Sequence, residues 1–279
     1  MSLKGRTIVM SGGSRGIGEA IAVKLARDGA NVALLAKTAE PHPKLPGTIF
    51  TAAKAIEEAG GVALPLVGDI RDDDFVASAV AKVAAEFGGI DVVINNASAI
   101  DLSRTEDLSM KKFDLMNNIN ARGTFLLSKL CIPHLRKSVN PHILSLSPPL
   151  QTEPRWHGKF TGYTMSKFGM SLVTLGLAEE LREDGIGVNS LWPRTTIFTA
   201  ATRFVGRADD TSSRTVDIMA DAAYVILTQP GKDLTGQFLM DDEVLAGTGV
   251  SDLSVYLPEG GRDADLKLDL WAEPTATIR

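Results

Sequence analysis

The sequence predicts an α/β fold: a single doubly wound domain with a mainly parallel seven-stranded sheet and helices on both faces. Two observations lead to this class. Short apolar runs typical of buried strands alternate along the chain with segments whose apolar residues recur at helical spacing. In addition, 44% of the 279 residues are hydrophobic, which is enough for one sizeable core. We expect the domain to occupy residues 1–250, followed by a tail at 251–279.

The first unit of this pattern is a strand, Thr7–Met10, that runs into a glycine-dense turn and then a helix. Gly12 lets the chain turn sharply, Gly16 lets the backbone approach a pyrophosphate, and Gly18 lets the helix pack closely on the strand. The spacing differs from the general Gly-x-Gly-x-x-Gly fingerprint, so the alternative is a tight connection without a ligand. We expect a dinucleotide to bind at Gly12, Ser14, Arg15, Gly16, Ile17 and Gly18.

A second strand, Asn31–Ala36, completes a strand–helix–strand unit with a parallel strand pair. NAD-binding proteins usually place a carboxylate after this strand, where it accepts from the ribose hydroxyls. Here Lys37 follows the strand and Arg15 lies in the glycine turn, and two cations suit a ribose 2′-phosphate. We therefore expect NADP as the cofactor, with NAD as the less favoured choice. The alternative is that Lys37 simply points into solvent.

The third strand, Val62–Val67, leads to Asp69 and Ile70. Because the carboxyl ends of parallel strands meet at one edge of a sheet, both residues are expected at the cofactor, with Asp69 accepting a hydrogen bond from the adenine amino group. The alternative role of Asp69 is to cap the helix expected at 72–87.

The fourth strand ends in Asn95-Asn96-Ala97-Ser98. Paired amides after a buried strand tie neighbouring backbones together, and small residues allow a ligand to approach closely. Asn95 and Ala97 are therefore expected to border the cofactor. The remaining elements are a proline-rich loop at 38–47, helices at 48–59, 110–120, 122–138 and 163–182, and strands at 142–146, 187–192 and 238–240.

Tyr163 and Lys167 open the helix at 163–182, and their i, i+4 spacing puts the phenol and the ammonium on one face. The ordinary pKa of a phenol is too high for acid–base work at neutral pH, and a nearby cation lowers it. Tyr163 is then able to give a proton to a carbonyl oxygen or to take one from an alcohol. The alternative is a half-exposed pair without chemistry, because the spacing alone is weak evidence.

Charge and composition exclude several classes of protein. A formal charge of −5 without a basic cluster argues against a nucleic-acid partner. The N-terminus has no apolar signal core and no run is long enough for a membrane span, so we expect a cytoplasmic protein. Cys131 is the only cysteine and lies in an apolar run typical of a buried thiol. The four histidines lack ligand spacing, and no metal is expected.

Up to about residue 250 the chain resembles the short-chain dehydrogenase/reductase family. The resemblance rests on the glycine turn, on Asp69, Asn95 and Asn120, and on the pair Tyr163 and Lys167. It implies a Rossmann-type domain in which Tyr163 is the general acid/base, while Lys167 lowers the pKa of Tyr163 and holds the nicotinamide ribose. It further implies that Asn120 anchors a water in the proton relay, and that the chain forms a homodimer or homotetramer.

The segments 37–49, 145–150 and 191–194 look more specifically like the hydroxysteroid-dehydrogenase-like subgroup of that family. Longer members of the subgroup add a sterol-carrier-protein domain, and the residues after 250 are too few for one.

Three positions depart from the family pattern. Pro148 stands where the catalytic serine is expected, so either Ser147 substitutes or the oxyanion lacks a serine donor. Pro193 is expected to border the cofactor, but Arg194 replaces the glycine after it and is a candidate to close over the nicotinamide or to bind an acidic substrate. Ser98 replaces a glycine, with little effect expected.

The family keeps its substrate lid near residues 195–214. Apolar residues in this stretch suggest a lipid-like substrate or, equally, a helix packed on the core. Arg203 and Arg207 are candidates for binding a carboxylate or phosphate of the substrate. For the tail at 251–279, an ordered subunit contact and a frayed terminus both remain open.

The sequence thus favours an NADP-dependent oxidoreductase that interconverts a carbonyl and a secondary alcohol on an apolar small molecule, with Tyr163, Lys167, Asn120 and Ser147 as catalytic residues. An NADP-binding protein with impaired or lost catalysis is the alternative. A sugar-nucleotide epimerase or dehydratase is a third hypothesis, against which the pair Gly16-x-Gly18 speaks.

Overall fold

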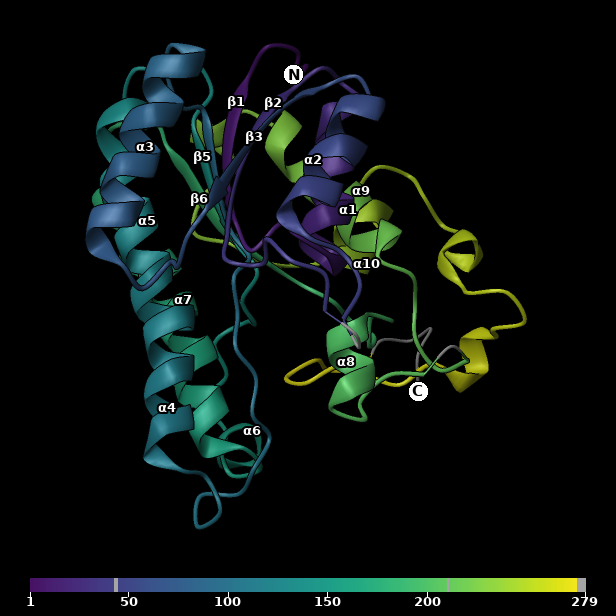
Figure 1. Ribbon diagram of the computed structural model, residues 1–279. Coiled ribbons are helices and arrows are strands. Elements are labelled where there is room, and N and C mark those ends of the chain that lie inside the picture. Colours follow the sequence, from purple (N-terminus) through teal and green to yellow (C-terminus); the bar gives the residue numbers. More distant parts are fainter. Residues whose placement is uncertain (43–44, 210, 275–279) are drawn as a thin grey trace.

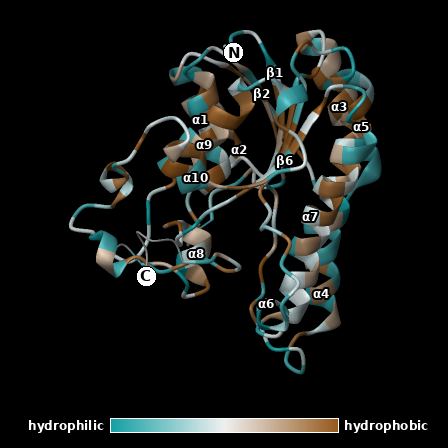
Figure 2. Ribbon diagram, turned by 180° about the vertical axis from the view of Figure 1, so that it is seen from behind, coloured by the Kyte–Doolittle hydropathy of each residue, from teal (hydrophilic) through white to brown (hydrophobic). Residues whose placement is uncertain are grey.

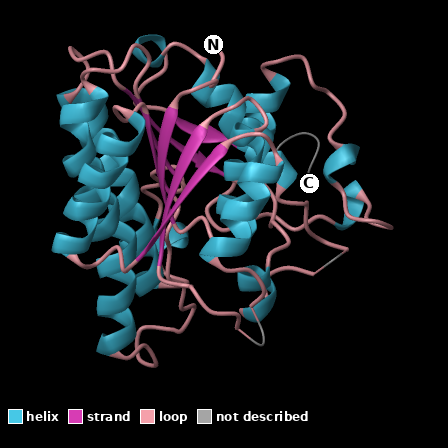
Figure 3. Cartoon of the chain, turned by 45° about the horizontal axis from the view of Figure 1, so that its top comes forward, coloured by secondary structure: helices cyan, strands magenta, loops and turns pink. Residues whose placement is uncertain are grey.

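Seven parallel strands form the centre of the computed structural model, which describes residues 1–42, 45–209 and 211–274. Small parts of the predicted proline-rich loop, lid and tail therefore lie outside the described residues. The strands lie in the order β3-β2-β1-β4-β5-β6-β7, and every neighbouring pair is parallel, which confirms the predicted sheet. Figure 3 shows this sheet between two groups of helices. Their bounds are β1 (Thr7–Ser11), β2 (Asn31–Ala36), β3 (Val62–Val67), β4 (Val92–Asn95), β5 (His142–Ser145), β6 (Gly187–Trp192) and β7 (Phe238–Met240).

Helices cover both faces of the sheet, as predicted (Figure 1). One face carries α1 (Gly16–Ala26), α2 (Ile49–Glu58), α9 (Asp217–Thr228) and α10 (Asp241–Ala246). The other carries α3 (Asp73–Phe87), α5 (Gly123–Leu135) and α7 (Thr161–Glu180). Beyond the carboxyl ends of the strands lie α4 (Met110–Asn117), α6 (Pro154–His157) and α8 (Ala200–Phe204). Short 3₁₀ turns occur at η2 (Gly231–Asp233), η3 (Ser254–Tyr256) and η4 (Asp263–Asp265).

The central strands are buried because their side chains alternate between two apolar layers. Ile8 and Met10 of β1 point into the layer beneath α1, α2 and α9, whereas Val9 points into the layer beneath α3, α5 and α7. Hydrophobic residues accordingly concentrate on the helix faces that cover the sheet (Figure 2). Cys131 belongs to the second layer, where burial raises the pKa of its thiol.

A third apolar cluster lies outside the sheet and includes Tyr163, Trp192 and Trp271. Trp271 comes from the C-terminal segment, which returns across its own domain. The backbone of Thr195 pairs with Leu268, and Asp269 N–H donates to the carbonyl of Arg194 at 3.0 Å. The described part of the tail is thus ordered against the domain that it follows, an arrangement that neither sequence-based alternative included.

Asn120 lies in a π-helical turn, Asn118–Arg122, that joins α4 to α5. The sequence predicted an ordinary helix up to this residue. A π turn widens the helix locally and is frequent at functional sites. Here it holds the Asn120 side chain against the loop after β4, where Oδ1 accepts from Ala99 N–H at 2.8 Å and Nδ2 donates to the Ala99 carbonyl at 3.0 Å.

Among the helices of the described ranges, none combines the length and hydrophobicity that crossing a membrane requires. The same ranges contain no group of three His, Cys, Asp or Glu side chains placed to hold a metal ion.

Candidate active site

A cavity of about 710 Å³ opens at the carboxyl ends of the strands, a size suited to a cofactor or a small-molecule ligand. It brings together most residues that the sequence assigned to cofactor binding and proton transfer. These are Gly12, Ser14, Arg15, Gly16, Ile17, Lys37, Asp69, Ile70, Ala97, Tyr163, Lys167 and Pro193. Four predicted site residues do not line it, namely Gly18, Asn95, Asn120 and Ser147.

The turn after β1 has the backbone shape that its glycines predict. Gly12 and Gly16 have φ angles of 76° and 60°, in the left-handed region that favours glycine. A Cβ at Gly12 would lie 2.7 Å from the Cα of Ala97, so a side chain there would displace the loop after β4. A Cβ at Gly16 would make only an ordinary contact with Thr199, at 3.6 Å, so the positive φ and not the available space requires glycine there.

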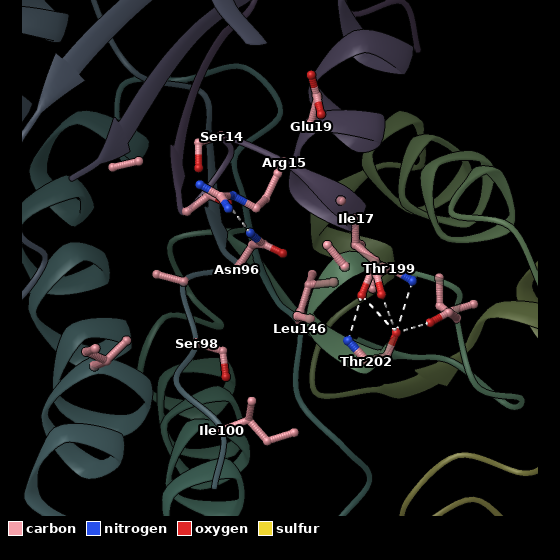
Figure 4. Close-up of a pocket in the computed structure, with 18 of the residues that line it drawn as sticks. Ser14, Arg15, Ile17, Glu19, Asn96, Ser98, Ile100, Leu146, Thr199 and Thr202 are labelled. Carbon is pink, nitrogen blue, oxygen red and sulfur yellow. Dashed lines mark hydrogen bonds between the residues drawn. The ribbon is translucent and has the colours of Figure 1, made fainter. Parts of the chain in front are cut away.

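The start of α1 is open to a negatively charged group. No side chain caps this helix, so its first N–H groups are left for a ligand. Gly18 lies behind them, where a Cβ would come within 2.4 Å of Asn96 Nδ2. Asn96 Nδ2 in turn donates to the Gly12 carbonyl at 2.7 Å and ties the loop after β4 to the turn (Figure 4). The uncapped N–H groups at the start of α1 fit the pyrophosphate of a dinucleotide.

Cations and one carboxylate lie at the far end of the cavity. Lys37 is exposed there, and Arg15 donates to the carbonyls of Leu45 and Gly47 at 2.7 and 3.0 Å, which holds the proline-rich loop against the turn. Arg71 hydrogen-bonds the carboxylate of Asp69 and lowers the pKa of Asp69, so this carboxylate stays an ionised acceptor. The cap of α3 is Asp72, which removes the alternative that Asp69 caps this helix.

Tyr163 and Lys167 lie on adjoining turns of α7 at the other end of the cavity. Burial and the Asp269 carboxylate raise the pKa of Tyr163, while a hydrogen bond from Ser98 opposes them. The predicted lowering of this pKa by Lys167 is not seen, because Lys167 is not among the groups that shift it. Burial lowers the pKa of Lys167 to about 7, so its ammonium is only partly charged at neutral pH. Its Nζ donates to the Leu146 carbonyl at 2.5 Å and lies 5.0 Å from the ring centroid of Trp192.

The C-terminal segment adds a carboxylate that the sequence analysis did not assign. Asp269 lines the cavity, and its Oδ1 accepts from Leu270 N–H at 2.6 Å. Burial raises the pKa of Asp269 to about 6, and the charges of Arg207 and Lys167 act in the opposite direction. Nothing in the sequence near Asp269 signals this position, because it depends on the tail returning to the domain.

Three predicted site residues lie behind the cavity wall, and two of them bond the surrounding framework. Asn95 Nδ2 donates to the hydroxyl of Ser128 at 3.0 Å, inside the layer between β4 and α5. The Asn120 amide bonds Ala99 and the Ser166 hydroxyl, which fixes the loop after β4 to α7. Ser147 is 0% exposed, and its Oγ has no hydrogen-bond partner among the described residues.

Arg194 does not reach the cavity, which corrects the expectation that it closes over the nicotinamide or binds an acidic substrate. Its side chain is 6% exposed and points toward α10, where Nε lies 3.1 Å from Asp242 and the guanidinium also contacts Glu243. A further bond of 3.1 Å runs from Nη1 to the carbonyl of Glu273. Arg194 is therefore the anchor that joins the loop after β6, α10 and the tail.

The predicted lid forms the wall opposite the β4 loop. Thr199 and Thr202 form a capping box at the start of α8, and both line the cavity (Figure 4). Arg207 also lines the cavity, whereas Arg203 and Phe204 are exposed to solvent. The apolar surface near Tyr163 comes instead from Ile100, Trp192 and Leu270.

Comparisons with known proteins agree with this arrangement. Residues 6–210 match the family model described as short chain dehydrogenase. The chain is 56% identical over 260 residues to hydroxysteroid dehydrogenase-like protein 2 of Danio rerio, an alignment that covers 93% of this chain and 62% of that protein. This chain thus spans about three fifths of the length of the curated relatives it matches.

Two solved structures are also similar. A short chain dehydrogenase from Mycobacterium thermoresistibile has a TM-score of 0.92 and 55% identity, with 99% of each chain covered. A metagenomic short-chain oxidoreductase, solved in complex with NADP, has a TM-score of 0.70 and 26% identity and covers 86% of this chain and 98% of its own. Fold, cavity and sequence agree: the chain belongs to the short-chain dehydrogenase/reductase family and is similar to the hydroxysteroid dehydrogenase-like proteins.

Proposed function

We propose that the chain is an NADP-dependent oxidoreductase that interconverts a carbonyl and a secondary alcohol on a lipid-like or other apolar small molecule. The observation that carries this proposal is that Tyr163 and Lys167 line the same cavity as the glycine turn. A proton donor beside a dinucleotide site is what reduction of a carbonyl requires.

The residues present suit NADP. The first N–H groups of α1 would hold the pyrophosphate, Lys37 and Arg15 the 2′-phosphate, and Asp69 the adenine. A bound nicotinamide supplies or accepts the hydride. The NADP complex of the metagenomic relative supports this choice of cofactor.

Tyr163 is in the right protonation state to act as an acid. Because its pKa is raised, the phenol keeps its proton at neutral pH and is ready to give it to a carbonyl oxygen. The surrounding Ile100, Trp192 and Leu270 favour an apolar substrate body, which leaves the reacting oxygen as the atom that needs polar partners.

The role of Tyr163 is tested with Tyr163→Phe, which keeps the ring and removes the hydroxyl. We expect kcat for NADPH-dependent reduction of a panel of apolar ketones and aldehydes to fall by at least about 100-fold. The dissociation constant for NADPH, measured by fluorescence titration, should stay close to that of the wild type. A variant with wild-type turnover would exclude Tyr163 as the acid.

Cofactor choice is tested with Lys37→Glu. The wild type should bind NADPH more tightly than NADH, and the substitution should weaken NADPH binding selectively by reversing a charge at the 2′-phosphate. Equal loss for both cofactors would place Lys37 outside the 2′-phosphate site.

A second candidate, an NADP-binding protein with impaired catalysis, is favoured by one observation. The hydroxyl of Ser147 is enclosed and does not reach the cavity. That candidate predicts tight NADPH binding without turnover across the whole substrate panel, and robust turnover of any substrate rules it out.

A further inference from the structure

The loop after β5 presents no serine hydroxyl to the cavity. Ser147 is wholly enclosed, and the next residue is Pro148, whose carbonyl accepts a hydrogen bond of 2.6 Å from Ser171 on α7. This bond holds the backbone after β5 against α7. A carbonyl substrate at Tyr163 would therefore lack a hydroxyl donor from this loop.

The loop after β4 presents a hydroxyl in the same region. Ser98 is exposed and lines the cavity (Figure 4). It also lies close enough to the phenol of Tyr163 to lower the pKa of that group. Its Oγ also lies 3.5 Å from the Ala99 carbonyl, a long contact that leaves the hydroxyl able to turn toward a ligand.

The backbone that carries Ser98 is fixed on both sides. Before it, Ala97 N–H donates to the Ser11 hydroxyl at 3.2 Å. After it, both backbone groups of Ala99 bond the Asn120 amide at 2.8 and 3.0 Å. A donor that is held in place before the substrate arrives loses little entropy on binding, which is the property required of a group that stabilises developing charge.

The other serine and threonine hydroxyls that line the cavity are placed for other tasks. Ser14 lies in the glycine turn, and Thr38 follows Lys37 at the opposite end of the cavity. Thr199 and Thr202 bond each other in the capping box of α8. Among the serines and threonines lining the cavity, Ser98 is the one that acts on the pKa of Tyr163.

We propose that Ser98 is a catalytic residue whose hydroxyl donates a hydrogen bond to the substrate oxygen beside Tyr163, in the place left by the enclosed Ser147. The proposal rests on the function proposed above. During reduction Tyr163 would give its proton to the carbonyl oxygen, and a bound reduced nicotinamide would supply the hydride to the carbonyl carbon. Ser98 keeps its own proton and stabilises the negative charge that develops on the oxygen.

The test uses Ser98→Ala in the full chain. We expect kcat to fall by about 100-fold, as for loss of one oxyanion donor, while the dissociation constant for NADPH stays unchanged. Ser98→Thr, which restores a hydroxyl, should recover most of the loss. Ser103→Ala is the matched control, because Ser103 lies in the same loop and does not line the cavity.

Three outcomes would overturn the proposal. The first is a wild-type kcat in Ser98→Ala, and the second is a loss of kcat in Ser147→Ala but not in Ser98→Ala. The third is a parallel loss of NADPH affinity in Ser98→Ala, because Ser98 would then be a cofactor ligand. Tyr163→Phe is measured alongside: if it loses turnover and Ser98→Ala does not, the proposed function stands and the role of Ser98 fails.

Discussion

The indole of Trp271 packs against the phenol of Tyr163, with ring centroids 5.6 Å apart and planes inclined by 35°. The same indole lies 5.5 Å from Phe168 and 5.6 Å from Trp192, and its Nε1–H donates to the Trp156 carbonyl at 2.9 Å. A residue of the C-terminal segment thus forms the wall behind the phenol of Tyr163.

Trp271→Ala should therefore lower the free energy of unfolding by about 3–5 kcal/mol, because it leaves a cavity in the aromatic cluster. Trp271 has a φ of 63°, a backbone conformation that strains tryptophan and alanine alike. The loss of stability in Trp271→Ala therefore measures the packing of the indole ring. Urea unfolding measures it. Trp271→Phe, which keeps an aromatic ring, should lose much less, and equal midpoints for Trp271→Ala and wild type would contradict the packing.

Asp269 should make stability depend on pH. Its pKa is raised in the folded chain from 3.8 to about 6, so the folded chain binds this proton more tightly than the unfolded chain does. The stabilisation of the folded chain by protonated Asp269 is complete below about pH 4 and is lost as the pH rises to about 6. The titratable groups facing Asp269 are Tyr163 and Lys167 on α7 and Arg207 from the lid.

In Asp269→Asn that decline should disappear, which urea unfolding between pH 4 and pH 7 will show. Glu259→Gln is the matched control, because Glu259 is an exposed carboxylate of the same tail. If Asp269→Asn keeps the wild-type slope, the titrating group is another one.

Arg194→Ala should lower the free energy of unfolding by about 3 kcal/mol, because Asp242 would remain largely buried without its partner. The control is Arg262→Ala, which breaks the exposed pair with Asp265 and should cost less than about 1 kcal/mol. If Arg194→Ala instead raised KM at unchanged stability, Arg194 would be a substrate ligand after all.

The chain should form a homodimer or homotetramer through α5 and α7. Four large apolar side chains on these helices are 46–59% exposed, namely Phe125 on α5 and Met165, Leu172 and Leu175 on α7. Exposed apolar side chains grouped in this way are typical of a surface that another subunit covers. Leu172→Glu should shift sedimentation velocity toward the monomer. Val255→Glu, at a site that is 75% exposed and belongs to the tail, should leave the distribution unchanged. A monomeric wild type would contradict the prediction.

Local patterns were enough to predict the sheet and the glycine turn. The bounds of β2, β3, β6 and β7 agree with the prediction, although only β2 and β6 are largely buried and the edge strands β3 and β7 are not. Gly12 and Gly16 were identified because the turn after β1 needs a positive φ at both positions, a local property of the backbone. Asn96 joins the loops after β1 and β4, as the paired amides predicted.

Other features depend on contacts between distant segments. Leucines alternate with charged residues just before Trp271, but this pattern does not say which surface the segment packs on, so the place of Trp271 behind Tyr163 follows only from the return of the tail. The backbone next to the enclosed Ser147 is held by the hydrogen bond from Ser171 to the Pro148 carbonyl. The side chain of Arg194 is held by a carboxylate on α10. Spacing along the chain identifies residue types but not the direction in which such side chains point.

The close approach of Gly12 to Ala97 links two parts of the cavity mechanically. Because a Cβ at Gly12 would already lie 2.7 Å from the Ala97 backbone, a ligand that shifts the turn also shifts the segment that leads to Ser98. We therefore expect cooperative and ordered binding: an apolar ketone should bind the NADPH complex more tightly than the free protein. Calorimetric titration in both states will measure this coupling, and equal affinities would show that the two loops respond independently.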